Sequence, residues 1–525
     1  MTIRTLVLAA ALSTVCAGQA LAADPTATTT FGPVVGEASS GVAAFKGVPF
    51  AAPPVGPLRW RAPQPPKAWT APRDAKNYGA DCMQKPFPGD AAPLGVTPAE
   101  DCLYANVWTP EAALKDKTKT GVKRPVMVWI YGGGFVNGGS SPAVYSGDRF
   151  ARDGVVLVSF NYRVGRFGFF AHPALTAAGA DGGMLGNYGL MDQIAALTWV
   201  RDNIAAFGGD PNNVTVFGES AGGMSVHALL TAPQAKGLFH KAIIQSGGGR
   251  PRLLPTLPLS APTGQRSAEG SGLAFASKAG VSGTDAAALE ALRALPAETV
   301  VDGLNMATSN TPTWGGGPML DGKIMTREPL QAYKAGAWAK MPVMVGATGA
   351  DGFFFGGTRD QVFAPFGARR AEAEALYDPK GDGDIKVYGW AAAGDRMFIE
   401  PARAVARVMS GQGAPAYQFR FSYVAESMRG QWWGAPHATE IPFVFDTVDA
   451  RYGAALTPAD AAAAKAAHAY WIGFAKSGVP AAPGLPAWPR YDSASDRILD
   501  FTAEGPKAEA DPRKARLDLV EATIP

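Results

Sequence analysis

The chain has 525 residues, of which 47% are hydrophobic and 18% charged, and its formal net charge is +3. This balance is typical of a large globular protein with an extensive core, either several domains or one large domain with insertions. It excludes a protein that binds nucleic acid through its overall charge, because the sequence holds no long run of Lys and Arg.

Residues 1–22 are predicted to be an export signal. Arg4 precedes an apolar run over 6–12, and the small residues Ala20 and Ala22 suit cleavage before Ala23. The apolar run is too short to span a bilayer, and no later run of 18 apolar residues follows it. We therefore expect a mature chain, residues 23–525, that is exported to the periplasm or secreted and has no membrane anchor.

Two cysteines remain once the signal is removed, Cys82 and Cys102. An even pair in an exported chain predicts a disulfide, because the compartments outside the cytoplasm are oxidising.

From residue 125 onward, apolar runs alternate with glycine-rich turns and helical segments. Buried strands are predicted over 125–131, 155–160, 214–217, 241–245 and 342–346. Two further strands are expected, one over 417–421 with a more solvated face, because polar and apolar residues alternate there, and one over 441–445. Helices are predicted over 192–207, 221–230, 286–294 and 459–476. This alternation predicts an α/β fold, a mostly parallel central sheet flanked by helices, with insertions near 250–315 and 355–415.

The segment Gly218-Glu219-Ser220-Ala221-Gly222 connects a predicted strand to a predicted helix. A serine in such a turn, with small residues two positions before and after it, is typical of the nucleophile elbow of α/β-hydrolases. The Ala221 amide, at the helix N-terminus, would then point toward an oxyanion formed beside Ser220 Oγ. Because the chain has 63 glycines, the alternative is that this segment is an ordinary turn. The presence of a base and an acid elsewhere in the chain distinguishes the two interpretations.

A nucleophilic serine needs a base, and the chain has five histidines. His227 and His468 fall inside predicted helices, His172 precedes a proline, and His240 opens a strand. His437 lies in a loop between Trp432-Trp433 and the segment 441–445, and we interpret it as the general base.

Other segments could complete the site. Asp351 directly follows the strand over 342–346, and the order Ser220, Asp351, His437 is the order expected of this fold. Gly133 and Gly134 follow the strand over 125–131 and offer amides that a substrate can approach. An aromatic substrate pocket is predicted from Phe135, Trp314, Phe353, Trp432 and Trp433, although several of these could be core residues.

Taken together, the chain resembles the type B carboxylesterases, a family that includes cholinesterases and fungal lipases. The similar segments include 45–51, 100–104, 131–135, 161–163, 186–193, 207–211, 218–223 and 245–247. The resemblance implies an α/β-hydrolase fold and hydrolysis of carboxylic esters, with Ser220 as nucleophile, His437 as base and Asp351 as orienting acid. It also implies oxyanion donors at Gly133, Gly134 and Ala221, supporting roles for Glu219 and Ser246, and an ion pair of Arg59 with Glu100 beside the Cys82–Cys102 disulfide.

Two departures from the family pattern matter. The usual acid is Glu, whereas Asp351 is one methylene shorter, so either its loop lies closer to His437 or another acid, Glu440, assists. The Cys82–Cys102 loop has no Trp to bind choline, which argues against a cholinesterase.

The sequence therefore predicts a serine esterase acting on small to medium apolar or aromatic esters. The alternatives are a lipase, an amide, carbamate or toxin-ester hydrolase, and a non-catalytic binding protein of the same fold. No metal or nucleotide cofactor and no nucleic-acid partner is expected, because no His/Cys cluster has ligand spacing and the glycine runs lack a P-loop Lys.

Overall fold

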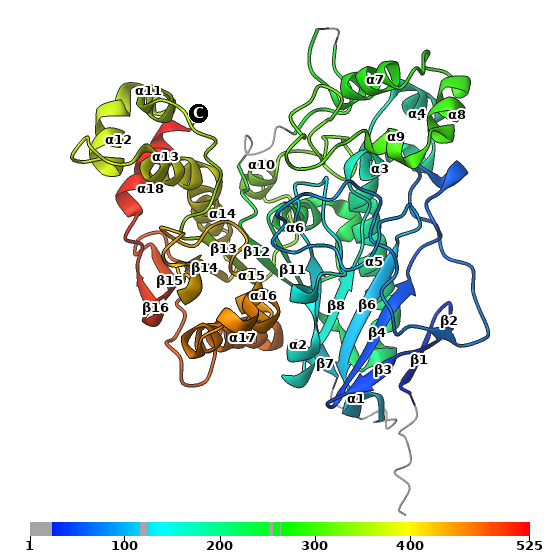
Figure 1. Ribbon diagram of the computed structural model, residues 1–525, viewed down its shortest axis with the longest axis horizontal. Coiled ribbons are helices and arrows are strands. Elements are labelled where there is room, and N and C mark those ends of the chain that lie inside the picture. Colours follow the sequence, from blue (N-terminus) through cyan, green and yellow to red (C-terminus); the bar gives the residue numbers. More distant parts are fainter. Residues whose placement is uncertain (1–23, 116–122, 251–255, 263, 525) are drawn as a thin grey trace, which may run out of the picture.

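The computed structural model describes residues 24–115, 123–250, 256–262 and 264–524. The predicted export signal lies outside these ranges. An eleven-stranded sheet runs through the molecule (Figure 1). Its strand order is β16 (Gly505–Ala510), β15 (Arg497–Thr502), β14 (Ala416–Phe421), β13 (Val343–Thr348), β12 (Lys241–Gln245), β11 (Gly209–Glu219), β7 (Arg124–Ile130), β8 (Val156–Phe160), β6 (Tyr104–Pro110), β4 (Val42–Pro49) and β3 (Glu37–Ser39).

The strands from β8 to β15 are parallel, and antiparallel pairs occur only toward the two edges of this sheet. This confirms the predicted mostly parallel α/β architecture. Two smaller sheets pair β1 (Thr26–Thr29), β2 (Gly32–Val35) and β5 (Arg73–Asp74), and β9 (Phe169–Phe170) with β10 (Gly186–Asn187).

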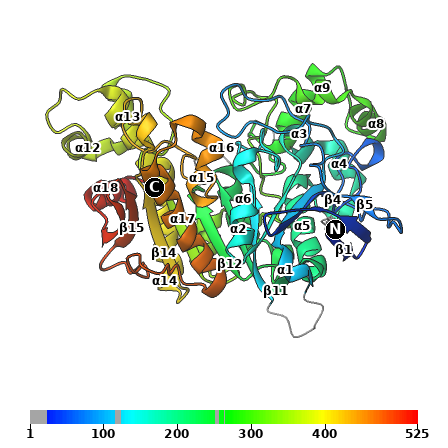
Figure 2. The ribbon, with the colours of Figure 1, turned by 60° about the horizontal axis from the view of Figure 1, so that its bottom comes forward.

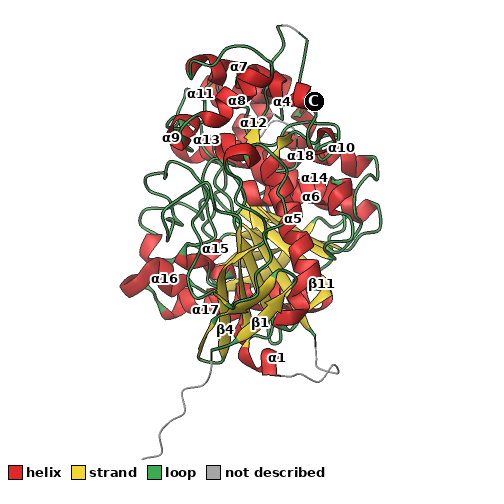
Figure 3. Ribbon diagram, turned by 90° about the vertical axis from the view of Figure 1, so that its right-hand side faces the viewer, coloured by secondary structure: helices red, strands yellow, loops and turns green. Residues whose placement is uncertain are grey.

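Helices cover both faces of the large sheet (Figure 3). One face carries α5 (Tyr188–Asn203), α6 (Ala221–Thr231) and α14 (Glu400–Gly411), and the other carries α16 (Val448–Tyr452) and α17 (Pro458–Ser477). Every residue of β8, β12 and β13 is buried, as the apolar runs predicted for strands covered on both faces.

The remaining helices are mostly short. They are α1 (Glu111–Lys115), α2 (Asp148–Arg152), α3 (Gly165–Gly168), α4 (Pro173–Ala178), α7 (Ala268–Lys278), α8 (Ala286–Ala294), α9 (Ala297–Val301), α10 (Pro329–Lys334), α11 (Arg359–Phe363), α12 (Arg370–Tyr377), α13 (Ile385–Gly394), α15 (Ile441–Val444) and α18 (Lys514–Thr523). Helices α7–α9 and α11–α13 lie at the same end of the molecule but on opposite sides (Figure 1). Figure 2 shows the N-terminal half of the chain on one side of the molecule and the C-terminal half on the other.

The prediction of a solvated face for the strand over 417–421 is wrong, because all of β14 is buried. The polar side chain of Arg420 in this strand is paired with a carboxylate inside the protein. Both outer nitrogens of Arg420 donate to the carboxylate of Asp511, at 2.8 and 2.7 Å. The prediction of a strand over 441–445 is also wrong, since Ile441–Val444 forms the helix α15.

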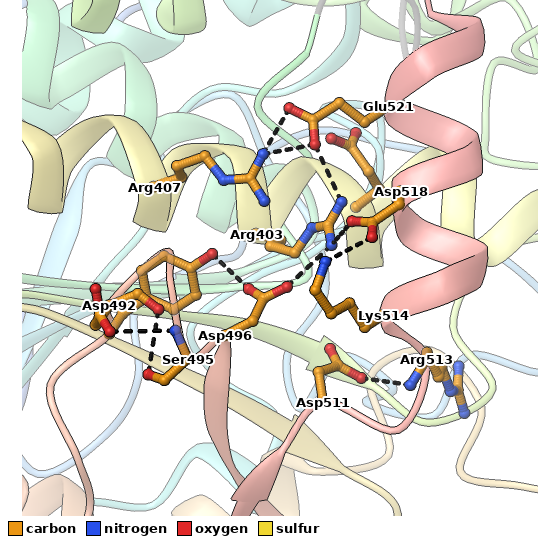
Figure 4. Close-up of polar contacts among 12 residues, drawn as sticks. Arg403, Arg407, Asp492, Ser495, Asp496, Asp511, Arg513, Lys514, Asp518 and Glu521 are labelled. Carbon is orange, nitrogen blue, oxygen red and sulfur yellow. Dashed lines mark hydrogen bonds and ion pairs between the residues drawn. The ribbon is translucent and has the colours of Figure 1, made fainter.

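The C-terminal helix α18 is bound to α14 by ionic contacts (Figure 4). The guanidinium of Arg403, in α14, is buried and lies 3.1 Å from Asp496, 2.7 Å from Asp518 and 3.1 Å from Glu521. Arg407, one turn further along α14, lies 2.6 Å from Glu521. These contacts fix the last helix of the chain against the sheet-covering layer.

The predicted disulfide between Cys82 and Cys102 is present. Beside it, Arg59 and Glu100 form the ion pair that the family resemblance implied, with a shortest distance of 2.6 Å. In the part of the chain that the structure describes, no helix is long and apolar enough to cross a membrane.

Candidate active site

Ser220 occupies a strained turn between β11 and α6. Its backbone angles are φ 55° and ψ −122°, a conformation that residues with a side chain rarely adopt. The strand and helix cross so closely that a Cβ on Gly218 would lie 2.6 Å from the carbonyl oxygen of Gly222. The Ser220 amide donates to the Gln245 carbonyl at 2.9 Å, which ties the turn to the end of β12.

His437 and Asp351 are brought together by two adjacent loops. Nδ1 of His437 lies 2.6 Å from Oδ1 of Asp351. The amide of Ala350 donates to the Ala435 carbonyl at 2.8 Å, so the loop that carries Asp351 is bound to the loop that carries His437. This close approach compensates for the missing methylene of an aspartate.

The Asp351 carboxylate is buried and fully surrounded by donors. Oδ2 accepts from Ser246 Oγ at 2.6 Å and from the Thr348 amide at 3.1 Å, and Oδ1 accepts from the Gly352 amide at 2.7 Å. Burial alone would raise the pKa of Asp351, but the charge of His437 and these hydrogen bonds lower it below the usual value. The carboxylate therefore stays ionised and fixes the orientation of the imidazole.

Glu219 lies on the opposite side of the imidazole, with Oε1 3.2 Å from His437 Nε2. Burial would lower the pKa of His437, but the charges of Glu219 and Asp351 outweigh it and raise that pKa to about 9. Burial also raises the pKa of Glu219 well above its ordinary value. Imidazole and carboxyl group are thus coupled in their protonation.

Glu440, considered above as an alternative acid, does not contact His437. Its Oε1 accepts from Gln245 Nε2 at 3.0 Å, and Gln245 in turn accepts from Trp471 Nε1 at 3.2 Å. Burial raises the pKa of Glu440 to about 7. Glu440 therefore acts on the imidazole only through its charge, from a distance.

Three amides are free to bind an oxyanion. Gly133 and Gly134 have φ angles of 104° and 62°, and Ala221 is the first residue of α6. Across the described residues, the N–H groups of these three positions donate to no other protein atom. Gly133 lies with Ser220 in the wall of the same pocket, so this geometry suits stabilisation of a developing negative charge.

A pocket of about 240 Å³ contains Ser220, Glu219 and His437 in its wall. Of the five aromatic residues predicted for the pocket, only Phe353 lines it, and its ring centroid lies 5.0 Å from that of His437. Phe135 and Trp314 are core residues, and Trp432 and Trp433 lie outside this pocket. The prediction failed for Phe135 and Trp314 because large aromatic residues in loops also fill the core. It failed for Trp432 and Trp433 because they lie nearer the surface, where Trp433 is 47% exposed.

Sequence reasoning missed several residues of the pocket wall. Those with polar or bulky side chains are Phe87, Asp90, Val144, Tyr145, Met306, Thr439, Ile441, Pro442, Arg451 and Tyr452. It also missed Phe398, whose ring centroid lies 4.8 Å from that of His437. They come from loops and short helices without a catalytic motif, so no pattern in the sequence marks them. No group of His, Cys, Asp and Glu residues within the described ranges could hold a metal ion.

A serine on a strained strand-to-helix turn shares a pocket with an imidazole that binds a carboxylate, and both of these groups are carried by later loops of a mostly parallel sheet. This arrangement is typical of an α/β-hydrolase. The Carboxylesterase family model matches residues 23–379 and 385–520. The chain belongs to this family, the type B carboxylesterases, and is a carboxylic ester hydrolase.

Curated relatives and solved structures agree with this assignment. The fumonisin B1 esterase of Sphingopyxis macrogoltabida is 36% identical over 88% of this chain and 84% of its own. The para-nitrobenzyl esterase of Bacillus subtilis (strain 168) is 36% identical over 91% of this chain and 94% of its own. A solved structure of a PNB esterase has a TM-score of 0.79 at 34% identity and covers 96% of this chain and 100% of the other.

Proposed function

We propose that Ser220, His437 and Asp351 form the catalytic triad of this esterase. The supporting observation is the geometry of the imidazole. Its Nδ1 is bound to Asp351 at 2.6 Å, and His437 lines the same pocket as Ser220. In this proposal His437 takes the Ser220 proton while Oγ attacks the ester carbonyl.

The rest of the cycle follows from the groups around the serine. The amides of Gly133, Gly134 and Ala221 hold the oxyanion of the tetrahedral intermediate, and removal of one such donor costs about 3 kcal/mol in comparable sites. His437 then returns its proton to the departing alcohol, leaving an acyl group on Ser220. Water, activated by the same imidazole, hydrolyses the acyl-enzyme.

The substrates we propose are small to medium apolar or aromatic esters. The pocket of about 240 Å³ is smaller than the roughly 300–1,000 Å³ of drug-sized sites and is lined partly by Phe353, Ile441 and Pro442. Two relatives are named for different esters, para-nitrobenzyl and fumonisin B1, so family membership does not by itself define the substrate.

The test compares wild-type protein with Ser220→Ala on 4-nitrophenyl esters from acetate to palmitate. We expect the wild type to hydrolyse the shorter esters best and the variant to lose turnover while remaining folded, as judged by its circular dichroism spectrum and melting temperature. Full activity in the variant, or an inert wild type, would contradict the proposed triad. A preference for emulsified palmitate would instead support a lipase.

We also propose that the protein is exported and loses residues 1–22. Intact-mass measurement of the protein from periplasm or medium should give a chain that begins at Ala23. A chain retaining Met1 in those fractions would contradict this cleavage.

A further inference from the structure

Arg451, in α16, is the one Lys or Arg side chain among the described residues that line the catalytic pocket. It is exposed, whereas Glu219 and His437 lie deeper in the same pocket. The pocket therefore has a cationic group near solvent and a carboxyl group beside the nucleophile.

The guanidinium of Arg451 has no protein partner within the described part of the chain. Between the described residues, no hydrogen bond or ion pair involves the Arg451 side chain. Neighbouring charges are already used, because Asp449 of the same helix lies 3.3 Å from Arg149, and Asp446 is paired with Lys465. A guanidinium without a partner, placed in the wall of a pocket, can bind a carboxylate through two parallel hydrogen bonds.

Asp90 is the acidic group that faces Arg451 within this pocket. The two side chains interact electrostatically but form no ion pair, and the Asp90 carboxylate accepts a hydrogen bond from the Ala92 amide at 2.9 Å. Asp90 would therefore compete weakly with an anionic ligand for Arg451 without occupying the guanidinium.

The charge distribution also defines an orientation for an anionic substrate. Arg451 attracts a carboxylate toward the opening, and no other Lys or Arg among the described residues lines the pocket. Apolar side chains of Ile441, Pro442 and Phe353 line the space that the body of the substrate would fill. A second cavity of about 670 Å³ shares Phe87, Gly89 and Asp90 with the pocket and offers room for the rest of a larger ester.

We propose that Arg451 binds a carboxylate of the substrate and that the enzyme prefers esters with a free carboxylate remote from the scissile bond. Half-esters of dicarboxylic acids and esters of hydroxy acids belong to this class. The inference rests on the proposed function of Ser220, because the carboxylate must be held while the ester carbonyl reaches that residue.

The test uses two pairs of substrates that differ in charge but little in shape. For an acyl-side carboxylate, mono-4-nitrophenyl adipate is compared with 4-nitrophenyl 6-methylheptanoate. For an alcohol-side carboxylate, 4-acetoxybenzoate is compared with 4-isopropylphenyl acetate. Comparing variants on the same substrate cancels the intrinsic reactivity of each ester.

We expect Arg451→Ala to lower kcat/KM for at least one carboxylate substrate roughly 5- to 20-fold, mainly through KM. The neutral partner should change by less than about twofold, because the contact is absent there. Arg451→Lys should retain part of the preference, and higher ionic strength should weaken it. Arg201→Ala is the matched control, since Arg201 is exposed, paired with Asp202 and outside the pocket.

Two results would overturn the inference. One is an equal effect of Arg451→Ala on charged and neutral members of both pairs, and the other is no effect on any of the four esters. Asp90→Asn should change activity in the opposite direction, because removing the competing negative charge should raise kcat/KM for the carboxylate substrate. If kcat/KM did not rise, this would count against the proposal. Turnover of the neutral esters that depends on Ser220 tests the proposed function separately.

Discussion

Glu219 Oε1 lies 3.2 Å from His437 Nε2, the ring nitrogen that takes the proton of Ser220 in the proposed triad. The carboxylate thus stabilises the protonated imidazole. A general base acts in its neutral form, so Glu219 influences the pH at which the enzyme becomes active.

We predict that Glu219→Gln moves the acidic limb of the pH profile of kcat/KM to lower pH. The charge of Glu219 raises the pKa of His437, so its removal lowers this pKa and leaves the imidazole neutral at lower pH. Measurement of kcat/KM from about pH 5 to 10 checks this. Glu440→Gln is the matched control and should produce a smaller shift, since Glu440 contacts Gln245 and not the imidazole. A limb that stays in place or rises in Glu219→Gln would contradict the argument.

Ser246→Ala should lower kcat about tenfold with little change in KM, because the Asp351 carboxylate loses a buried donor that lies 2.6 Å away. Steady-state kinetics on a neutral 4-nitrophenyl ester measures this. Ser422→Ala is the control, since Ser422 Oγ also donates to a carboxylate, that of Asp500, which is not in the catalytic pocket. Equal losses in both variants would point to a general loss of stability and not to the site.

Replacement of both Cys82 and Cys102 by Ser should destabilise the fold by about 3 kcal/mol through the greater freedom of the unfolded chain. It should also raise KM, because the loop that the disulfide closes carries Phe87 and Asp90 of the pocket wall. Urea unfolding with and without a thiol reductant checks the first effect. The reductant should destabilise the wild type and leave the stability of the double variant unchanged. If the reductant also destabilised the double variant, the effect could not be assigned to the Cys82–Cys102 disulfide.

Arg403→Leu should destabilise the protein by about 3–5 kcal/mol, because it leaves the buried carboxylate of Asp496 without its cation. Arg407→Leu should cost less than about 1 kcal/mol, since the side chains of Arg407 and Glu521 are each about one third exposed, so water screens their ion pair. The two variants remove the same kind of side chain, one helical turn apart. Comparison of their urea unfolding midpoints checks the prediction. Similar midpoints would show that burial of the pair is not decisive.

Local patterns in the sequence predicted the parts of the site that are defined by a single turn. The glycines around Ser220 and the glycine run at 132–134 mark turns that only small residues allow, and these lie where predicted. The strand over 417–421 shows the limit of such reasoning. Its polar residues read as solvated because their partner, Asp511, is 91 residues away from Arg420.

The wall of the pocket was less predictable for the same reason. Asp90 and Arg451 belong to an irregular loop and to a short helix, and each alone resembles an ordinary surface charge. Only the packing of distant segments places them in one cavity. Conversely, Trp314 and Phe135 lie in loops near the catalytic motifs but are buried in the core.

The hydrogen bond between Gln245 and Glu440 joins residues that are 195 positions apart, and His437 lies 86 positions beyond its partner Asp351. The turn that carries Ser220 is thus synthesised before the loop that carries His437, its proposed base. If His437 is the base, as proposed above, a nascent chain that ends before this residue cannot yet hydrolyse esters. Activity therefore reports completion of the fold, and two separately expressed fragments divided between β12 and β13 should be inactive alone and regain turnover only on reassociation.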